Sequence, residues 1–312
     1  MSKLFIIGNG FDLSHCMDTR YSDFRKYLIR TYPESEKISE EDDIFFDKQI
    51  DGHGEIVKPL DYQVVGWLLN TIDFLGDYNW SDLENYLGMI TFDNYYNEEN
   101  YPEDEDGDIN PWKQVEINED IYFYFPYMGE RLFEFFNDWV YEIKYKKSLK
   151  DFSRLINLEK DYFLNFNYTE TLEKKYNIKK VCHIHGKLGE TLLFGHGNDE
   201  ECISEVQGGL GIGAEDSVQS TRDIWKKDTK GALENNKNFF DQLGNKQIKK
   251  IYSYGFSYGK VDEIYIKEII KKINGKDVTW YLDDYNNEIN LNYKKIIEDL
   301  GFKGKIKEFS CN

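Results

Sequence analysis

"LFIIGNGFDLSH", residues 4–15, joins an apolar run directly to a glycine turn. A buried strand that runs straight into such a turn opens many nucleotide-binding domains. The dinucleotide fingerprint G-x-G-x-x-G is incomplete, because Leu13 stands where its third glycine would be. Gly8 and Gly10 would still let the backbone approach a phosphate closely. The stretch therefore predicts either a nucleotide site or a tight turn without a ligand.

Further apolar runs continue the pattern along the chain. They predict buried strands at 162–166, 181–184, 191–194, 251–255, 279–282 and 306–309. Helical spacing of apolar residues separates them, at 21–32, 170–176, 235–243 and 262–273. Short continuous apolar strands alternating with helices are typical of a parallel sheet covered on both faces. We predict a Rossmann-like, doubly wound α/β fold with a mostly parallel sheet.

The stretch from residue 35 to 150 interrupts this alternation. It is mostly helical in pattern, for example at 62–75 and 127–145. We predict a single α/β domain over residues 1–312 that carries residues 35–150 as a helical insertion. Residues 207–217 are rich in glycine, and their apolar residues follow neither the helical nor the strand periodicity, which predicts a loop.

Composition narrows the class of protein. The 58 acidic and 39 basic residues give a formal charge of −19, which argues against general nucleic-acid binding. No apolar run reaches eighteen residues, so no membrane span is expected, and the start of the chain is too short in apolar residues for a signal peptide. Four cysteines without paired spacing favour a cytoplasmic location.

Polar residues gather where four of the predicted strands end. They are Gly8, Asn9, Gly10 and Asp12; Asn165 and Asn167; His183 and His185; and Gly255, Ser257 and Asp262. Ligands of open α/β sheets collect at the carboxyl ends of the strands. Taken singly, each group also has a structural reading, such as a helix cap, a turn residue or a hydrogen-bonded histidine at a strand end. His-x-His spacing permits a metal, but no C-x-x-C or H-E-x-x-H accompanies it, so no metal is expected.

The order of these motifs is more specific than any one of them. In sequence they are "LFIIGNGFDLSH", "YSDFRKYL", "LNFNYTETLEKKY", "HIHGK", "FGHGN" and "GFSYGKVDEIYI". Together they resemble the bacteriophage abortive infection AbiH family from Phe5 to about Tyr265. That family in turn resembles a distant branch of the sirtuin-like NAD-binding domains.

The sirtuin-like resemblance implies a role for each motif. Gly8, Asn9 and Gly10 would bind the pyrophosphate of NAD, with Asp12 in the same turn. "SDFR", 22–25, would place Asp23 and Arg25 at the nicotinamide end, and Gly255, Ser257 and Asp262 would hold the adenosine end. Asn167 would orient the ribose or the attacking water, and His185 would be the general base.

The departures from the sirtuin pattern limit what it implies. The two C-x-x-C pairs that bind zinc in sirtuin deacetylases are absent, so protein deacetylation is not expected. The resemblance implies a defence protein that binds NAD and hydrolyses it to release nicotinamide, under the control of a phage-derived trigger and with homo-oligomer contacts. A domain that only senses NAD or ADP-ribose, and a nuclease or nucleotidase toxin on the same fold, remain the alternatives.

Overall fold

The computed structural model describes most of the chain. The described residues are 2–38, 50–54, 57–76, 78–90, 102–103, 106–146, 152–197, 213–245, 247–273 and 275–311. They divide into two compact units. The sheet unit comprises Met1–Arg20, Val140–Leu193 and Lys227–Asn312, and the helical unit comprises Tyr21–Trp139 and Phe194–Lys226.

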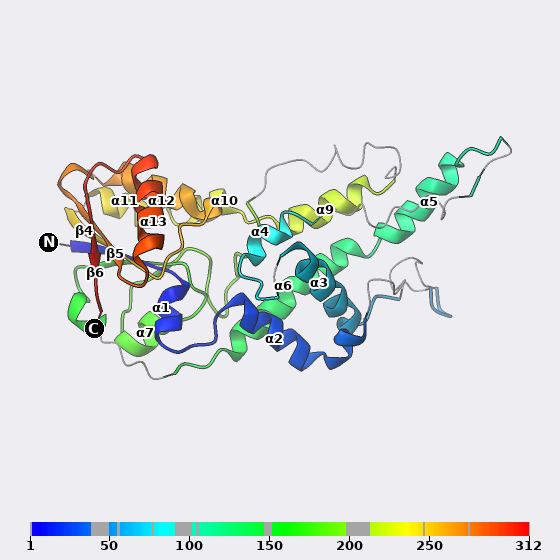
Figure 1. Cartoon of the computed structure of the whole chain (residues 1–312), viewed down its shortest axis with the longest axis horizontal. Helices are drawn as coiled ribbons and strands as arrows, with labels where there is room; N and C mark the ends of the chain where they lie inside the picture. The colour runs from blue at the N-terminus through cyan, green and yellow to red at the C-terminus, as the bar shows by residue number, and fades with distance from the viewer. Residues whose placement is uncertain are drawn as a thin grey trace. The chain divides into compact units, whose positions relative to one another are not determined.

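Six parallel strands form the sheet of the sheet unit (Figure 1). They are β1 (Ser2–Ile7), β2 (Tyr162–Asn165), β3 (Cys182–His183), β4 (Ile248–Tyr254), β5 (Thr279–Asp283) and β6 (Lys305–Phe309). Their spatial order is β3-β2-β1-β4-β5-β6. The predicted α/β class and the parallel sheet are therefore confirmed.

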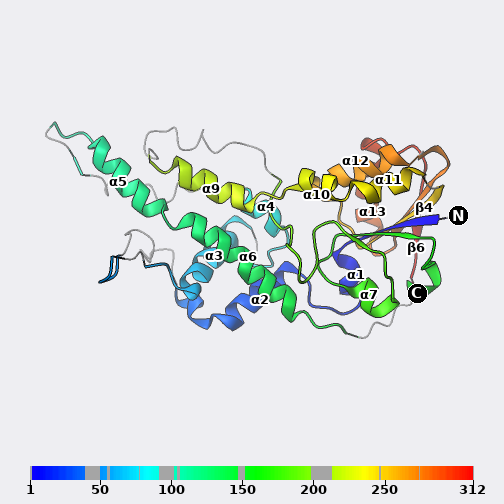
Figure 2. The ribbon, with the colours of Figure 1, turned by 180° about the vertical axis from the view of Figure 1, so that it is seen from behind.

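The helices of the sheet unit follow the strands. They are α1 (Asn9–Ser14), α7 (Thr171–Tyr176), α10 (Thr229–Asn235), α11 (Lys237–Asn245), α12 (Glu263–Lys272) and α13 (Asn287–Asp299), with 3-10 turns η4 (Phe152–Leu155), η5 (Lys260–Asp262) and η6 (Gly275–Asp277). α11 confirms the helix predicted at 235–243 to within two residues at each end, and α10 is an additional helix that precedes it; the two lie one after the other in Figure 2.

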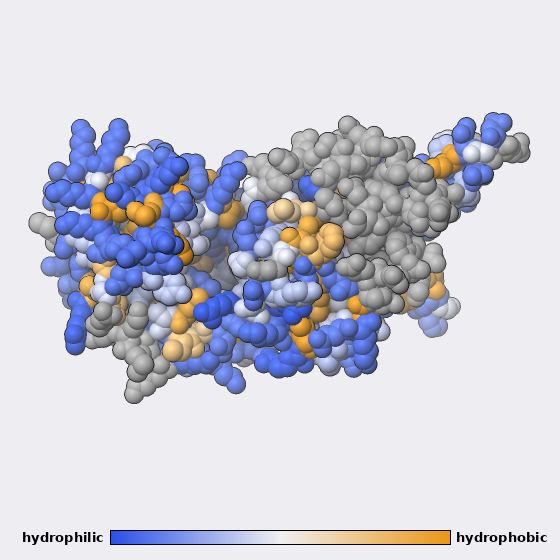
Figure 3. Space-filling view, in the orientation of Figure 1, coloured by the Kyte–Doolittle hydropathy of each residue, from blue (hydrophilic) through white to orange (hydrophobic). Residues whose placement is uncertain are grey.

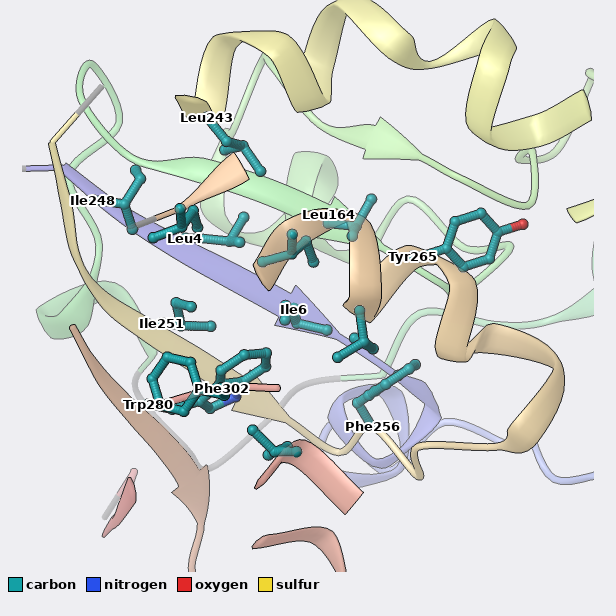
Figure 4. Close-up of a cluster of buried hydrophobic side chains, with 14 of the residues drawn as sticks. Leu4, Ile6, Leu164, Leu243, Ile248, Ile251, Phe256, Tyr265, Trp280 and Phe302 are labelled. Atoms are coloured by element: carbon teal, nitrogen blue, oxygen red, sulfur yellow. The ribbon is translucent and has the colours of Figure 1, made fainter. Parts of the chain in front are cut away.

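β1 shows why both faces of the sheet are covered. Its side chains alternate, so that Leu4 and Ile6 join one core cluster while Phe5 and Ile7 join the other. Side chains of α11, α12 and α13 complete the first cluster, part of which Figure 4 shows. Side chains of α1, η4 and α7 complete the second. All four β1 residues are fully buried, which explains the continuous apolar run in the sequence.

The helical unit packs an aromatic core of its own. Its helices are α2 (Tyr21–Thr31), η1 (Pro33–Lys37), α3 (Asp61–Leu75), α4 (Leu83–Leu87), α5 (Pro111–Tyr122), most of α6 (Phe125–Glu142) and α9 (Glu215–Trp225). No helix among the described residues is long and apolar enough to cross a membrane. The face of the sheet unit seen in Figure 3 is largely hydrophilic, as the composition predicts.

Two local predictions are wrong. Residues 191–194 form no strand: the amide of Leu193 donates to the carbonyl of His185 in a loop, and Phe194 stacks on Phe136 within the helical unit. The run is apolar because Leu192 and Phe194 are buried, and burial does not require strand pairing. The loop predicted at 207–217 overlaps the start of α9 at Glu215, and its residues 207–212 lie outside the described part.

Candidate functional site

The sheet changes direction between β1 and β4. From β1 the chain builds outward through β2 and β3, and then returns to the other side of β1 with β4, β5 and β6. The order 3-2-1-4-5-6 is that of dinucleotide-binding α/β folds, whose ligands lie outside the carboxyl ends of the strands at this reversal. The residues after β1 and β4 are therefore where a ligand is expected.

Glycines bring the turns after β1 and β4 into backbone contact. The amide of Gly8 donates to the carbonyl of Tyr254 at 3.0 Å, and the amide of Gly10 donates to that of Gly255 at 2.9 Å. A Cβ on Gly8 would lie 2.5 Å from the carbonyl oxygen of Gly255, and a Cβ on Gly10 would lie 2.5 Å from its Cα. Gly255 itself has a φ of +63°, which favours glycine. The glycines of the opening motif are thus explained by the close approach of a second turn.

Asn9 is the exposed residue of the first turn. Its side chain is held on both sides by Thr19, through Nδ2 to the Thr19 carbonyl at 2.8 Å and through Oδ1 from the Thr19 hydroxyl at 2.6 Å. Its backbone N–H has no hydrogen-bond partner among the residues that the structure describes. In the turn after β4, Ser257 is also exposed, and Asp283 of β5 accepts the Gly255 amide at 2.5 Å. Among the described residues, this edge therefore offers the free amide of Asn9 and the exposed hydroxyl of Ser257.

Asn167 connects the end of β2 to the first turn. Its Nδ2 donates to the carbonyl of Gly8 at 3.0 Å, and its own amide donates to Oδ1 of Asn165 at 3.1 Å. His183 lies beside the same segment, with Nε2 2.7 Å from Oε1 of Glu173. The sequence predicted Asn167 and His183 at the carboxyl edge of the sheet. In the structure, Asn167 stabilises the glycine turn through its hydrogen bond to Gly8.

Asp12 lies beneath this turn and is 1% exposed. The hydroxyl of Thr169 donates to its Oδ2 at 2.5 Å, whereas its Oδ1 has no hydrogen-bond partner in the described part of the chain. Burial raises the pKa of the Asp12 carboxyl to about 6, although hydrogen bonds from Thr169 and Thr171 oppose the rise. The carboxyl group supports the β2 turn from inside.

His185 meets two charged side chains at the carboxyl end of the sheet. Its Nε2 lies 3.2 Å from Oδ1 of Asp262, and Nζ of Lys227 lies 3.3 Å from the same oxygen. The His185 contact has the distance but not the alignment of a hydrogen bond. Burial alone would raise the pKa of the Asp262 carboxyl, but Lys227 and His185 outweigh it and lower that pKa to about 2. Asp262 is therefore a carboxylate shared by two cation-forming groups.

Aromatic rings enclose the His185 imidazole, which is 3% exposed. Phe166 meets it edge-on at 5.2 Å between ring centroids, and the rings of Tyr265 and Tyr168 lie at 5.7 and 6.4 Å. Nδ1 of His185 makes no hydrogen bond with the described residues. A carboxylate at Nε2 favours the tautomer protonated there, and this leaves Nδ1 as a proton acceptor.

Asp23 and Arg25 belong to the helical unit. Arg25 binds Asp73 through two nitrogens at 2.6 and 3.0 Å, and Asp23 pairs with Lys26 at 3.1 Å on α2. The guanidinium is thus committed to a partner within its own unit. Their predicted place at the nicotinamide end stays a prediction.

The sequence did not predict Lys227 or Asp283 as members of this edge. Lys227 stands in "WKKDTK", which matches no motif, and Asp283 is one of two consecutive aspartates after a strand. Only the second carries a usable signal, since an acid at the carboxyl end of a parallel strand is a candidate by position. Among the described residues, no three or more histidine, cysteine, aspartate or glutamate side chains gather as a metal would require.

Comparison with protein families gives a match over most of the chain. Residues 4–284 match the family described as "Bacteriophage abortive infection AbiH". Searches of the curated proteins and of the solved structures find no match. The matched range begins at β1 and ends just after β5, so it includes every residue of the edge described above.

Proposed function

We propose that this chain, which belongs to the bacteriophage abortive infection AbiH family and is an antiphage defence protein, binds NAD and hydrolyses it to nicotinamide and ADP-ribose. The observation that carries the proposal is the His185–Asp262 pair at the carboxyl edge of a sheet with the dinucleotide-binding strand order. The proposal also follows the sirtuin-like pattern of the motifs.

The described residues offer hydrogen-bond donors for the pyrophosphate of NAD, but they change the role expected of the two glycines. The free amide of Asn9 and the exposed hydroxyl of Ser257 are donors to a phosphate or ribose oxygen. The space beside Gly8 and Gly10 is already filled by the turn after β4, so these glycines shape the site rather than cradle the phosphate. Because the net charge of −19 repels an anionic dinucleotide, its attraction to the site depends on such local donors.

The proposed reaction breaks the bond between the ribose C1′ and the nicotinamide nitrogen. The bonding electrons leave with nicotinamide, and positive charge develops on the ribose ring. A water oxygen then bonds to C1′ while Nδ1 of His185 accepts its proton, and Asp262 stabilises the imidazolium that forms. Asn167, which holds the Gly8 carbonyl, keeps the turn in place for this step.

The test is nicotinamide release from NAD by the purified chain, alone and with extract of phage-infected cells to supply a trigger. We expect release that falls at least about 100-fold in His185→Ala, with the fold checked by circular dichroism. His53→Ala is the matched control, because His53 is an exposed histidine of the helical unit. Equal release by the two variants would remove His185 from the reaction.

Binding separates the proposal from its alternatives. Calorimetric binding of NAD without release under either condition would identify a sensor. Absence of binding, with the strand core intact by hydrogen exchange, would overturn both the hydrolase and the sensor. The nuclease alternative predicts loss of added nucleic acid, for which the described residues offer no cluster of metal-binding side chains.

A further inference from the structure

We propose that Lys227 is a positioning residue that keeps His185 neutral by holding Asp262 in a balanced ion pair. The inference rests on the proposed function for its catalytic meaning, since a neutral imidazole is the form that accepts a proton from water. Its structural part, the control of His185 protonation by Lys227, does not depend on whether the protein catalyses a reaction.

The geometry places three groups around one oxygen. Nε2 of His185 and Nζ of Lys227 approach the same Oδ1 of Asp262, at 3.2 and 3.3 Å. The two nitrogens are therefore within about 7 Å of each other, a range over which charges in a protein interact strongly. Lys227 is 4% exposed and His185 3% exposed, so water screens this interaction little.

Charge balance decides the protonation of the imidazole. One carboxylate and one ammonium form a neutral pair, and a proton on His185 would add a net positive charge in a buried place. The aromatic side chains that the structure describes against the ring are those of Phe166, Tyr168 and Tyr265, which carry no charge that would offset it. Removing the ammonium would leave Asp262 with His185 as its remaining partner of opposite sign, and would favour the imidazolium.

The position of Lys227 in the chain gives it little freedom. It is the first residue of the sheet unit after the chain returns from α9, and its carbonyl accepts the Thr229 amide at 2.8 Å. Trp225, two residues earlier, is fully buried in the helical unit. The backbone of Lys227 is thus bound to the start of α10, in the same unit as Asp262.

The experiment is ¹H–¹⁵N NMR of histidine-labelled full-length protein, which separates neutral from protonated rings, with His185→Gln to assign the signal. In Lys227→Met we expect the ratio of protonated to neutral His185 to rise about tenfold to a hundredfold at a given pH. Lys227→Arg should keep the wild-type ratio, and so should the matched control Lys303→Met, an exposed lysine of the same unit.

The opposite change completes the test. Asp262→Asn should lower the ratio, and Lys227→Gln replaces Lys227→Met if the latter does not fold. An unchanged ratio in the folded neutral variant would overturn the inference even if NAD is cleaved. A raised ratio in a protein that never cleaves NAD would retain the inference and reject the proposed function. Where cleavage occurs, nicotinamide release by the neutral variant should peak at a higher pH than in the wild type.

Discussion

Replacing the buried Asp12 by asparagine tests whether its carboxyl group is held without full hydrogen bonding. The ordinary pKa of 3.8 rises to about 6 in the folded chain, chiefly because of burial. An acid whose folded pKa is raised stabilises the fold fully below its unfolded pKa, and this contribution is lost as the pH rises through the folded value. The wild type should therefore lose stability between about pH 4 and pH 7.

The magnitude follows from the two values. At ~1.4 kcal/mol for each pH unit, a rise from 3.8 to about 6 corresponds to about 3 kcal/mol of unfolding free energy. Asparagine keeps an acceptor for the Thr169 hydroxyl and does not ionise. The stability of Asp12→Asn minus that of the wild type should thus increase by about 3 kcal/mol from pH 4 to pH 7.5.

Urea unfolding at several pH values measures this difference, with pulsed hydrogen exchange of the β1 peptide reporting the sheet unit alone. Asp284→Asn is the matched control, because Asp284 is an exposed aspartate of the same unit. A difference for Asp12→Asn that stays constant to within ~0.5 kcal/mol across this range would refute the reasoning. It would mean that the charged carboxylate is as well stabilised in the fold as in the unfolded chain.

Three further predictions concern the same unit. Gly255→Ala should cost roughly 3 kcal/mol or more in urea unfolding, because a Cβ there collides with the Gly10 backbone, whereas Gly259→Ala meets open space and should cost little. Ser253→Ala should cost about 2 to 4 kcal/mol in the same assay, since its hydroxyl accepts two buried donors, a tyrosine hydroxyl and a tryptophan N–H. Iodoacetamide at pH 8 should label exposed Cys16 and spare Cys182, whose pKa burial raises to about 12.

Much of the fold was predictable because the central strands of the sheet, such as β1 and β4, are buried on both faces. Continuous apolar runs then coincide with strands, as in β1, β2 and β4. The same rule failed at 191–194, where Leu192 and Phe194 fill core space from a loop. An apolar run reports burial, and only the pairing partners, which lie elsewhere in the sequence, decide whether it becomes a strand.

The positions of the candidate site residues were predictable to the extent that these residues follow strands. His185 and Asn167 stand at strand ends in the sequence, and the structure places both at the carboxyl edge. Asp262 was also singled out, but its contact with His185 depends on how η5 packs after β4. No local sequence pattern predicts such a contact, because an ion pair between segments far apart in the chain has no characteristic spacing in the sequence.

Leu193 and Lys227 are the residues at which the sheet unit joins the segment 194–226 of the helical unit. The chain leaves the sheet unit after Leu193 and returns at Lys227. The amide of Leu193 donates to the His185 carbonyl at 2.8 Å, while Lys227 shares the carboxylate that faces the His185 ring. Within the helical unit the two connecting segments pair with each other, through the His196 amide and the Trp225 carbonyl at 2.9 Å. The two connections between the units therefore begin and end beside His185, one at its backbone carbonyl and the other at the carboxylate that faces its ring, because the covalent order of the chain places Leu193 and Lys227 there.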